Sequence, residues 1–344
     1  MIRGLSAWML KILLAGVAIT SFAIQGFAQQ TLNSVKNRDK LLCGISPVAP
    51  GFSYLDDHGV RHGFDIDICG AVAVAVLGRA DKVEYVPLNT NVRFQAVQSG
   101  GVDLLSAQTT WTFSRDNSLG LDFGPIVFHD GQSVMVPADL NVKSIGDLAD
   151  ATICLLSGTT NLQNLEDYFR PRGLKYEPVV FENSDEWRNA FFAGRCDAIS
   201  ADASVLASIR SMATGARQYK LLPERISREP IAPAIPRNDS NWRGIISWTF
   251  YALVTAEAKG IKKDNVDSFS ASDDPEIQRL LGTTPGFGKM LGLRNEWAHD
   301  VIKSVGNYGE VFDRNLGASS PLQLPRGENR LWTEGGLIYS PPFR

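Results

Sequence analysis

Short apolar segments alternate with amphipathic ones along most of the sequence, and this alternation limits the possible fold more than any other feature. Each apolar segment has the length of a β-strand, and each amphipathic segment has the apolar spacing of a helix. Such alternation is typical of the α/β class, in which helices cover both faces of a mostly parallel sheet. The predicted strands cover residues 41–46, 82–88, 102–107, 152–156, 177–181 and 196–201, and the predicted helices cover 64–77, 162–169, 185–193 and 203–212.

Two segments of the chain resemble each other. AVQSGGVDLLSAQ, residues 96–108, aligns with AFFAGRCDAISAD, residues 190–202, and the alignment places Asp103 over Asp197. We interpret the two segments as the same βα element, used once in each of two α/β lobes. Chance similarity is the alternative, because the pattern is short. A chain of this length normally forms two domains, which agrees with two lobes.

Polar residues follow these strands at the edge where α/β proteins bind ligands. In open α/β sheets the ligand lies beyond the carboxyl ends of the strands. Gln108 and Asp202 follow the two aligned strands, and Gly158-Thr159-Thr160 follows another strand at the start of a helix. Free backbone N–H groups at a helix start attract an anion. We therefore expect these residues to line a cleft.

Five residues near these strand ends have the chemistry of a receptor for a zwitterion. An arginine binds a carboxylate through two parallel hydrogen bonds, threonine hydroxyls complete an anion site, and an aspartate pairs with an ammonium group. Together they suit the charged end of an α-amino acid. The five residues are Thr110, Arg115, Thr159, Thr160 and Asp202.

Each of these residues also has a purely structural interpretation. Arg115 could form a solvated surface pair with the neighbouring Asp116. Asp202 could be the N-cap of the helix that follows it. Thr160 fits a capping box with Gln163. Their joint placement at strand ends favours the binding site.

Sequence signatures of catalysis and of nucleic-acid binding are weak. Residues 29–344 contain no G-x-S-x-G sequence, Gly286-Phe-Gly288 lacks the third glycine of a dinucleotide loop, and Met290 replaces the Ser or Thr of a phosphate loop. Without the first 28 residues the chain has 32 basic and 37 acidic side chains, a net charge near −5. This balance argues against nucleic acid or an anionic membrane surface as a partner.

The first 28 residues have the order of a secretory signal peptide. Arg3 and Lys11 supply positive charge, residues 12–24 are apolar, and Gly26-Phe-Ala28 offers a small-residue cleavage site. The apolar run is shorter than the ~20 residues of a spanning helix, so an uncleaved anchor is the weaker alternative. We expect an exported chain that begins near Gln29.

Four cysteines, Cys43, Cys69, Cys154 and Cys196, remain in the exported chain, where disulfides can form. Four cysteines allow three pairings. Buried free cysteines are one alternative and a zinc site is another. The zinc site is disfavoured because no C-x-x-C spacing exists and the four histidines are scattered, so we expect no metal.

Several of these segments together resemble a known family. GFDIDIC (63–69), GGVDLLSAQTTWTFSRD (100–116), LLSGTT (155–160) and GRCDAISAD (194–202) are similar to the periplasmic substrate-binding proteins of polar amino-acid ABC importers, the family 3 solute-binding proteins. Among these, the general L-amino-acid-binding proteins are the most similar group. The likeness covers nearly all of residues 29–344.

The resemblance implies the two-lobed periplasmic-binding-protein fold of type II, in which each lobe is a mostly parallel sheet flanked by helices. Lobe 1 would comprise residues 29–136 and 235–344, and lobe 2 residues 137–234. The chain would cross between the lobes near Pro137 and near residues 230–236. No cofactor is expected.

The resemblance also implies a role for each site residue. Arg115 and the Thr110 backbone would hold the α-carboxylate of the ligand, and Thr160 would assist from lobe 2. Asp202 would bind the α-ammonium group, and the backbone or amide of Gln108 would also reach it.

One departure from the family concerns the ligand side chain. Many relatives have an aromatic residue in the loop after the first strand, where SPVAPGF in this chain has Ala49. We expect either that Phe52 covers the ligand side chain instead or that the pocket is wider and less selective.

The lobes of the implied fold also predict the disulfides. Cys43 begins a strand that the helix of Cys69 should cover, and Cys154 and Cys196 belong to strands of one sheet in lobe 2. We therefore expect the pairs Cys43–Cys69 and Cys154–Cys196.

The function implied by the resemblance is a monomeric periplasmic protein that binds L-amino acids, closes around them and delivers them to a membrane-embedded ABC permease. A secreted enzyme on the same scaffold, a dehydratase or a lytic enzyme, is the alternative. Such an enzyme needs a general acid or base in the cleft, for which Glu182 and Glu186 are the candidates.

Overall fold

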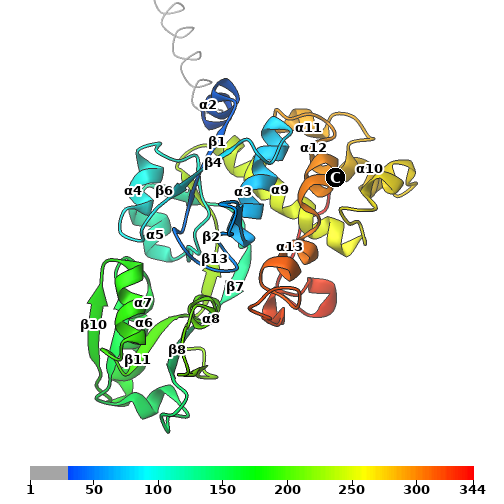
Figure 1. Ribbon diagram of the computed structural model, residues 1–344. Helices are drawn as coiled ribbons and strands as arrows, with labels where there is room; N and C mark the ends of the chain where they lie inside the picture. The colour runs from blue at the N-terminus through cyan, green and yellow to red at the C-terminus, as the bar shows by residue number, and fades with distance from the viewer. Residues whose placement is uncertain (1–29) are drawn as a thin grey trace, which may run out of the picture.

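The computed structural model describes residues 30–344, which form two five-stranded sheets joined by a pair of short strands (Figure 1). The first sheet has the order β4 (Val83–Pro87), β1 (Leu41–Ile45), β5 (Leu104–Leu105), β14 (Ala234–Pro236) and β6 (Leu121–Phe123). The second has the order β10 (Glu177–Phe181), β9 (Thr152–Leu156), β11 (Ala198–Asp202), β8 (Gln132–Pro137) and β12 (Tyr219–Leu221). The first three strands of each sheet are parallel.

Helices flank both sheets. Those around the first sheet are α2 (Gln30–Arg38), α3 (Phe64–Leu77), α4 (Arg93–Gln98), α5 (Phe113–Ser118) and α9 (Ser240–Ala258). The second sheet carries η1 (Ile145–Leu148), α6 (Asn161–Phe169), η2 (Arg170–Arg172), α7 (Ser184–Phe192) and α8 (Ala203–Ser211). After α9 come η3 (Val266–Ala271), α10 (Pro275–Leu281), α11 (Phe287–Met290), α12 (Trp297–Val305), α13 (Tyr308–Asn315), η4 (Gly327–Asn329) and η5 (Trp332–Glu334). A small hairpin pairs β2 (Tyr54–Leu55) with β3 (Arg61–His62).

The second sheet repeats the strand order of the first, which agrees with the interpretation that the two similar segments are the same βα element in two lobes. The strands β4, β1 and β5 correspond to β10, β9 and β11. The two aligned aspartates, Asp103 and Asp197, make equivalent hydrogen bonds in the two sheets. Oδ2 of Asp103 accepts a hydrogen bond from the backbone N–H of Leu42, and Oδ2 of Asp197 accepts one from Thr152, each at 2.8 Å. Each carboxylate therefore ties the start of one strand to the start of its parallel neighbour.

Helix α3 is the centre of the larger half of the molecule. Its sequence is apolar on all sides because α3 packs on β1 on one side and on α9 and α12 on the others. The helix ends at Gly78, whose φ of 78° is a left-handed conformation that glycine adopts without strain. The residues after α9 extend this packing outward, and Figure 1 shows α10, α12 and α13 beyond α3 and α9.

The two sheets are joined by β7 (Phe128–Asp130) and β13 (Glu229–Ile231), which pair antiparallel. The next strand, β8, pairs with β11 in the second sheet. The predicted lobe boundary between residues 136 and 137 therefore falls inside a strand, and residues 132–136 lie in the second sheet and not with the first. The crossing was predicted near Pro137, but Pro137 is the last residue of β8, so the whole strand comes after the crossing.

The structure contains the disulfides Cys43–Cys69 and Cys154–Cys196, the pairs that the sequence predicted. The first joins β1 to α3, the helix that covers it, and the second joins β9 to Cys196, two residues before the start of β11. All four cysteines are bonded, so neither the zinc site nor the free cysteines apply.

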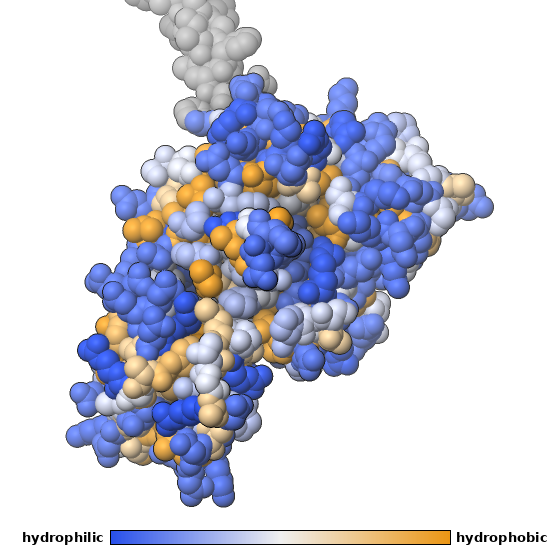
Figure 2. Space-filling model, in the orientation of Figure 1, coloured by the Kyte–Doolittle hydropathy of each residue, from blue (hydrophilic) through white to orange (hydrophobic). Residues whose placement is uncertain are grey.

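The predicted signal peptide, residues 1–28, lies outside the described residues. From residue 30 onward, no helix combines the length and the apolar character needed to cross a membrane. Figure 2 shows a narrower part, which contains the second sheet, joined to a wider one, and hydrophilic residues cover most of the visible face.

Candidate functional site

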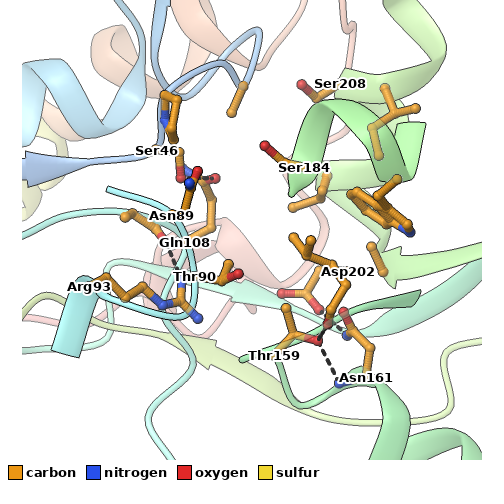
Figure 3. Close-up of a pocket in the computed structure, with 18 of the residues that line it drawn as sticks. Ser46, Asn89, Thr90, Arg93, Gln108, Thr159, Asn161, Ser184, Asp202 and Ser208 are labelled. Atoms are coloured by element: carbon orange, nitrogen blue, oxygen red, sulfur yellow. Dashed lines mark hydrogen bonds between the residues drawn. The ribbon is translucent and has the colours of Figure 1, made fainter. Parts of the chain in front are cut away.

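A cavity lies between the two sheets, at the carboxyl ends of their parallel strands. The segments that follow β1, β4 and β5 form one wall, and the segments that follow β9, β10 and β11 form the other. Figure 3 shows Ser46, Arg93 and Gln108 on the first wall, and Thr159 and Asp202 on the second. The placement agrees with the rule that ligands of α/β sheets bind beyond the strand ends.

Gln108 is held in one orientation by its neighbours. Its backbone φ of 41° is left-handed, three residues after the end of β5. Its amide Nε2 donates to Asp65, and its Oε1 accepts a hydrogen bond from Ser46 Oγ at 3.1 Å. Asp65 also accepts one from Ser106 Oγ at 2.8 Å. Burial raises the pKa of Asp65 to about 7, although these hydrogen bonds oppose the shift.

Arg115 lies on the first turn of α5, where its backbone N–H donates to the N-cap Thr112 Oγ1 at 3.2 Å. Its side chain is buried, only 9% of the residue is exposed, and Nη1 donates to the Thr110 carbonyl at 2.9 Å. No ion pair joins it to Asp116. The surface-pair interpretation is therefore wrong. Burial lowers the pKa of Arg115, while Glu229 and Asp202 raise it, and an arginine remains a cation in such surroundings.

Asp202 is 7% exposed at the end of β11 and lines the second wall. It occupies the N-cap position of α8, but its side chain accepts no capping hydrogen bond from that helix, so capping does not account for the carboxylate. Its Oδ1 accepts a hydrogen bond from Asn161 Nδ2 at 3.2 Å. Burial raises the pKa of Asp202 well above its usual range, and the charges of Glu229 and Asp130 raise it further. Such a carboxylate gains from a cation beside it.

The turn before α6 contributes both predicted threonines to the second wall. Thr159 Oγ1 donates to the Leu156 carbonyl at 2.7 Å and accepts from the Asn161 N–H at 3.3 Å. Thr160 Oγ1 donates to Glu229 Oε2 at 3.0 Å and makes no capping bond, so the predicted capping box is absent from α6. Glu229 belongs to β13, and this bond ties the turn to the connection between the sheets.

Phe52 does not line the cavity, and its prediction as a cover for the ligand side chain is wrong. It is 1% exposed and packs edge-on against Phe64 and Phe128, with ring centroids 6.3 and 5.9 Å apart. A Cβ on Gly63 would lie 2.1 Å from the Phe52 carbonyl oxygen, so only glycine lets the two segments approach this closely. Ala49, in contrast, lines the cavity.

The two candidate catalytic carboxylates differ in position. Glu182 follows β10 and lines the cavity, whereas Glu186 is exposed on α7 outside the lining. Among residues 30–344, no group of three or more His, Cys, Asp or Glu side chains is arranged to hold a metal ion. The groups that the described lining presents to a ligand are therefore hydrogen-bonding and charged side chains and backbone atoms.

Several lining residues were missed by the sequence reasoning. Arg93 begins α4 just after the end of β4, which is a strand end like those that were considered. Asn161 follows the predicted threonines directly. Trp187 and Arg188 lie inside α7, and no motif at sequence level distinguishes them from other residues of an amphipathic helix.

A model of the family described as bacterial extracellular solute-binding proteins, family 3, matches residues 41–272. These residues include both sheets and every segment that lines the cavity. The chain belongs to this family. The matched region ends before α10. Residues 273–344 of this chain therefore form a C-terminal extension beyond the family model.

Two curated proteins are similar to this family 3 chain over almost its whole length. The general L-amino acid-binding periplasmic protein AapJ of Rhizobium johnstonii is 47% identical, over 96% of this chain and 97% of its own. The glutamate/glutamine/aspartate/asparagine-binding protein BztA of Rhodobacter capsulatus is also 47% identical, over 95% and 97%. Both alignments therefore include most of the C-terminal extension.

A solved structure confirms the two-lobed periplasmic-binding-protein fold. It is an ABC transporter periplasmic binding protein from Brucella ovis with glutathione bound. The two chains are 44% identical and superpose with a TM-score of 0.89, over 91% of this chain and 99% of that one.

Proposed function

We propose that this family 3 protein binds L-amino acids in the periplasm and delivers them to the permease of an ABC importer. One observation carries the proposal. Arg115 and Asp202 are buried, have opposite charges and line one cavity from opposite walls. Neither forms an ion pair with another side chain in the part of the chain that the structure describes. A buried charge needs a partner, and a zwitterion supplies one to each.

The α-carboxylate of the ligand would bind the Arg115 guanidinium, which offers paired N–H groups in a plane. The backbone of Thr110 and the turn of Thr159 and Thr160, at the start of α6, would complete the anion site. The α-ammonium group would bind Asp202. Its positive charge would offset the repulsion among Asp202, Glu229 and Asp130 that raises the Asp202 pKa.

The printed names of the relatives support this ligand class. AapJ is named for general L-amino acids, BztA for glutamate, glutamine, aspartate and asparagine, and the Brucella ovis protein contains glutathione. Glutathione keeps a free α-amino and α-carboxylate group on its glutamyl residue. Ala49 lines the cavity at the position where many relatives have an aromatic residue. This small side chain fits a pocket of broad selectivity.

Ligand release without chemical change is part of the proposal. The relatives are named as binding proteins, and of the two candidate carboxylates only Glu182 lines the cavity. Mass spectrometry of an amino acid incubated with the protein distinguishes the two functions. Unchanged recovery is expected, and a dehydrated or hydrolysed product would favour the enzyme.

We assign the two chain crossings to β7 and β13, so that β8 belongs to lobe 2 and closure bends these two strands. The mature protein, cleaved near Gln29, would act as a monomer whose closed form the permease recognises. The sequence of residues 1–28 supports export.

Calorimetry with a panel of ligands tests the proposal. The panel contains L-glutamate, L-glutamine, L-leucine and glutathione, with D-glutamate, an amino-acid amide and a 2-hydroxy acid as matched analogues. We expect the L-amino acids to bind, the amide to fail at the Arg115 side and the 2-hydroxy acid to fail at the Asp202 side. Equal binding of an amino acid and both of its analogues would contradict the proposed site.

A further inference from the structure

The two walls of the cavity touch where the loop after β4 meets the turn after β9. Thr90 Oγ1 donates a hydrogen bond to the Ser157 carbonyl at 2.8 Å. Ser157 Oγ donates one to Asn91 Oδ1, also at 2.8 Å. These bonds cross from the first sheet's side of the molecule to the second's, so they exist only while the two walls are together.

Gly158, the next residue of the turn, adds two more contacts. Its carbonyl oxygen accepts hydrogen bonds from Nη2 of Arg93 and from Nη2 of Arg115, each at 3.3 Å. Its φ is 72°, and a Cβ at this position would lie 2.9 Å from the Thr90 carbonyl oxygen and 2.8 Å from Asn91 Oδ1. The contact between the walls therefore requires glycine for both its conformation and its closeness.

We propose that Thr90, Asn91, Ser157 and Gly158 form a latch that holds the lobes closed over the ligand, and that Arg115 connects the latch to ligand binding. The proposal rests on the proposed function. Hydrogen bonds to both walls fix the Arg115 guanidinium. Nη1 donates to the Thr110 carbonyl on the first wall, and Nη2 donates to the Gly158 carbonyl on the second. A carboxylate seated on Arg115 is thus bound to a group that is fixed only in the closed form.

Latch residues are positioning residues, since their hydrogen bonds hold the two walls together. Of the four, only Thr90 also lines the cavity. Their loss should speed the release of ligand and leave the choice of ligand unchanged. The structure offers matched pairs of variants. Asn91→Asp keeps the acceptor oxygen that Asn91→Ala removes, and Thr90→Ser keeps the hydroxyl that Thr90→Val removes.

Stopped-flow fluorescence with L-glutamate measures the effect, because Trp187 lines the cavity and reports on binding. We expect Asn91→Ala and Thr90→Val to raise the dissociation rate about five-fold each, the effect of one hydrogen bond, with association nearly unchanged. Asn91→Asp and Thr90→Ser should stay near wild type. Equal dissociation rates in both members of each pair would overturn the latch.

Gly158→Ala tests the same contact without removing a hydrogen-bonding group. Small-angle scattering of the ligand-free protein should show a larger radius of gyration for Gly158→Ala than for the control Gly173→Ala, whose Cβ would meet open space at the same left-handed φ. Equal radii would contradict the latch. This readout needs no ligand, so it decides the latch even if wild type binds no amino acid, a result that would instead refute the proposed function.

A second cavity, of about 760 Å³, lies between the C-terminal extension and the second sheet's half of the molecule. At two places in the chain, one residue lines the ligand cavity and the next residue lines the second cavity. Thr110 lines the ligand cavity and Trp111 the second cavity, and likewise Asp202 and Ala203. The strands β7 and β13 also line the second cavity, which places the two cavities on opposite sides of the connection between the sheets.

The extension is attached to the first sheet's half and to β7. The side-chain amide of Asn329 accepts a hydrogen bond from the His129 N–H at 2.7 Å and donates one to the His129 carbonyl at 2.9 Å. Tyr308 Oη donates to the Val127 carbonyl at 3.0 Å, and Arg326 pairs with Glu257 on α9 at 3.0 Å. The loop of η4 is therefore fixed on one side of the second cavity.

We further infer that the extension limits how far the ligand cavity opens. Rotation about β7 and β13 that widens one cavity narrows the other. Glu328 lines the second cavity from the extension, and Arg210 and Arg228 line it from the opposite half. Opening would bring these opposite charges into contact, and this contact would set the end point of the motion and stabilise the open form there.

A bulky residue in the second cavity should therefore favour the closed form. We expect Glu328→Trp to bind L-glutamate a few-fold more tightly than wild type, because the closed fraction of the free protein rises. Glu334→Trp, exposed on the same extension but outside the cavity, is the matched control. Affinity equal to wild type or weaker would overturn the inference. Glu328→Lys, which places a positive charge opposite the arginines, should also tighten binding, more at low salt than at high salt.

Discussion

Arg115 donates a hydrogen bond to the carbonyl oxygen of Gly158, 3.3 Å away on the opposite wall of the ligand cavity. The same guanidinium is the group that we assign to the α-carboxylate of the ligand. One side chain thus takes part in both ligand recognition and lobe contact. A change at Arg115 should consequently reduce affinity through both.

Replacing Arg115 should weaken ligand binding strongly and folding little. Arg115→Ala leaves a desolvated carboxylate without its partner, which costs about 2–5 kcal/mol, or roughly thirty-fold to several thousand-fold in affinity. Arg115→Lys should fall between this variant and wild type, because an ammonium cannot reproduce the planar pair of N–H groups. Calorimetry with L-glutamate measures both. Arg195→Lys, an exposed arginine outside the cavity, serves as the control and should change nothing.

Amino-acid affinity should fall as the pH is lowered towards the raised pKa of Asp202. The pKa of Asp202 is raised above its usual range, so the carboxylate takes up a proton as the pH falls through that raised value and no longer attracts an ammonium group. Asp202→Asn should bind weakly at every pH and lose this dependence. Titrations at several pH values provide the comparison, with Asp116→Asn as the control. A parallel pH dependence in wild type and Asp202→Asn would show that another group is responsible.

Asp65 should make the ligand-free protein less stable as the pH rises. Its pKa of about 7 when folded exceeds the value of 3.8 for a free aspartate, so the folded protein retains a proton that the unfolded chain releases. The stabilisation from this proton is complete below about pH 4 and is lost as the pH rises to about 7. The loss is on the order of 4 kcal/mol at most.

The variant Asp65→Asn tests this sign. The asparagine keeps one oxygen to accept the Ser106 hydroxyl and cannot ionise. Urea unfolding at pH 5 and pH 8 should therefore show Asp65→Asn gaining stability relative to wild type at the higher pH. An unchanged difference between the two proteins at both pH values would mean that Asp65 does not titrate in this range.

Removing the Cys154–Cys196 disulfide should destabilise the protein by about 2–5 kcal/mol. The bridge closes a segment with a sequence separation of 42, against 26 for Cys43–Cys69, so its loss frees more of the unfolded chain. Thermal unfolding of Cys154→Ser/Cys196→Ser and of Cys43→Ser/Cys69→Ser gives the two costs. A reductant should lower the midpoint of wild type, and a variant lacking both bridges should not respond to it.

Much of the site could be predicted from sequence because its residues follow strands. Thr159, Thr160 and Asp202 were chosen as polar residues just after apolar strands, and Arg115 as part of the polar segment that follows residues 102–107. All four line the cavity. The carboxyl ends of parallel strands meet at one edge, so position along the chain implies position in space. The same logic would have found Arg93, which follows β4.

The errors arose where a local pattern did not specify a neighbour. Phe52 was one of two alternatives for the ligand side chain because its loop follows β1. Its ring is buried in the core instead, and only glycine at position 63 lets the backbone of residue 52 approach so closely. Pro137 was read as a crossing between lobes, although the antiparallel pairing of β8 with β11 keeps residues 132–136 in the second sheet.

The sequence by itself determined the class of elements, their order and the polar strand ends, because each depends on periodicity or spacing within a short segment. The cysteine pairs were expected only from the two-lobed fold that the family resemblance implies, since each pair joins residues 26 or 42 positions apart. Tertiary structure alone decided which groups meet across the cavity. The hydrogen bond from Arg115 to Gly158 joins residues 43 positions apart, and the bonds of Asn329 to His129 join residues 200 apart. Such contacts depend on how two separately folded sheets pack, and no local pattern encodes that arrangement.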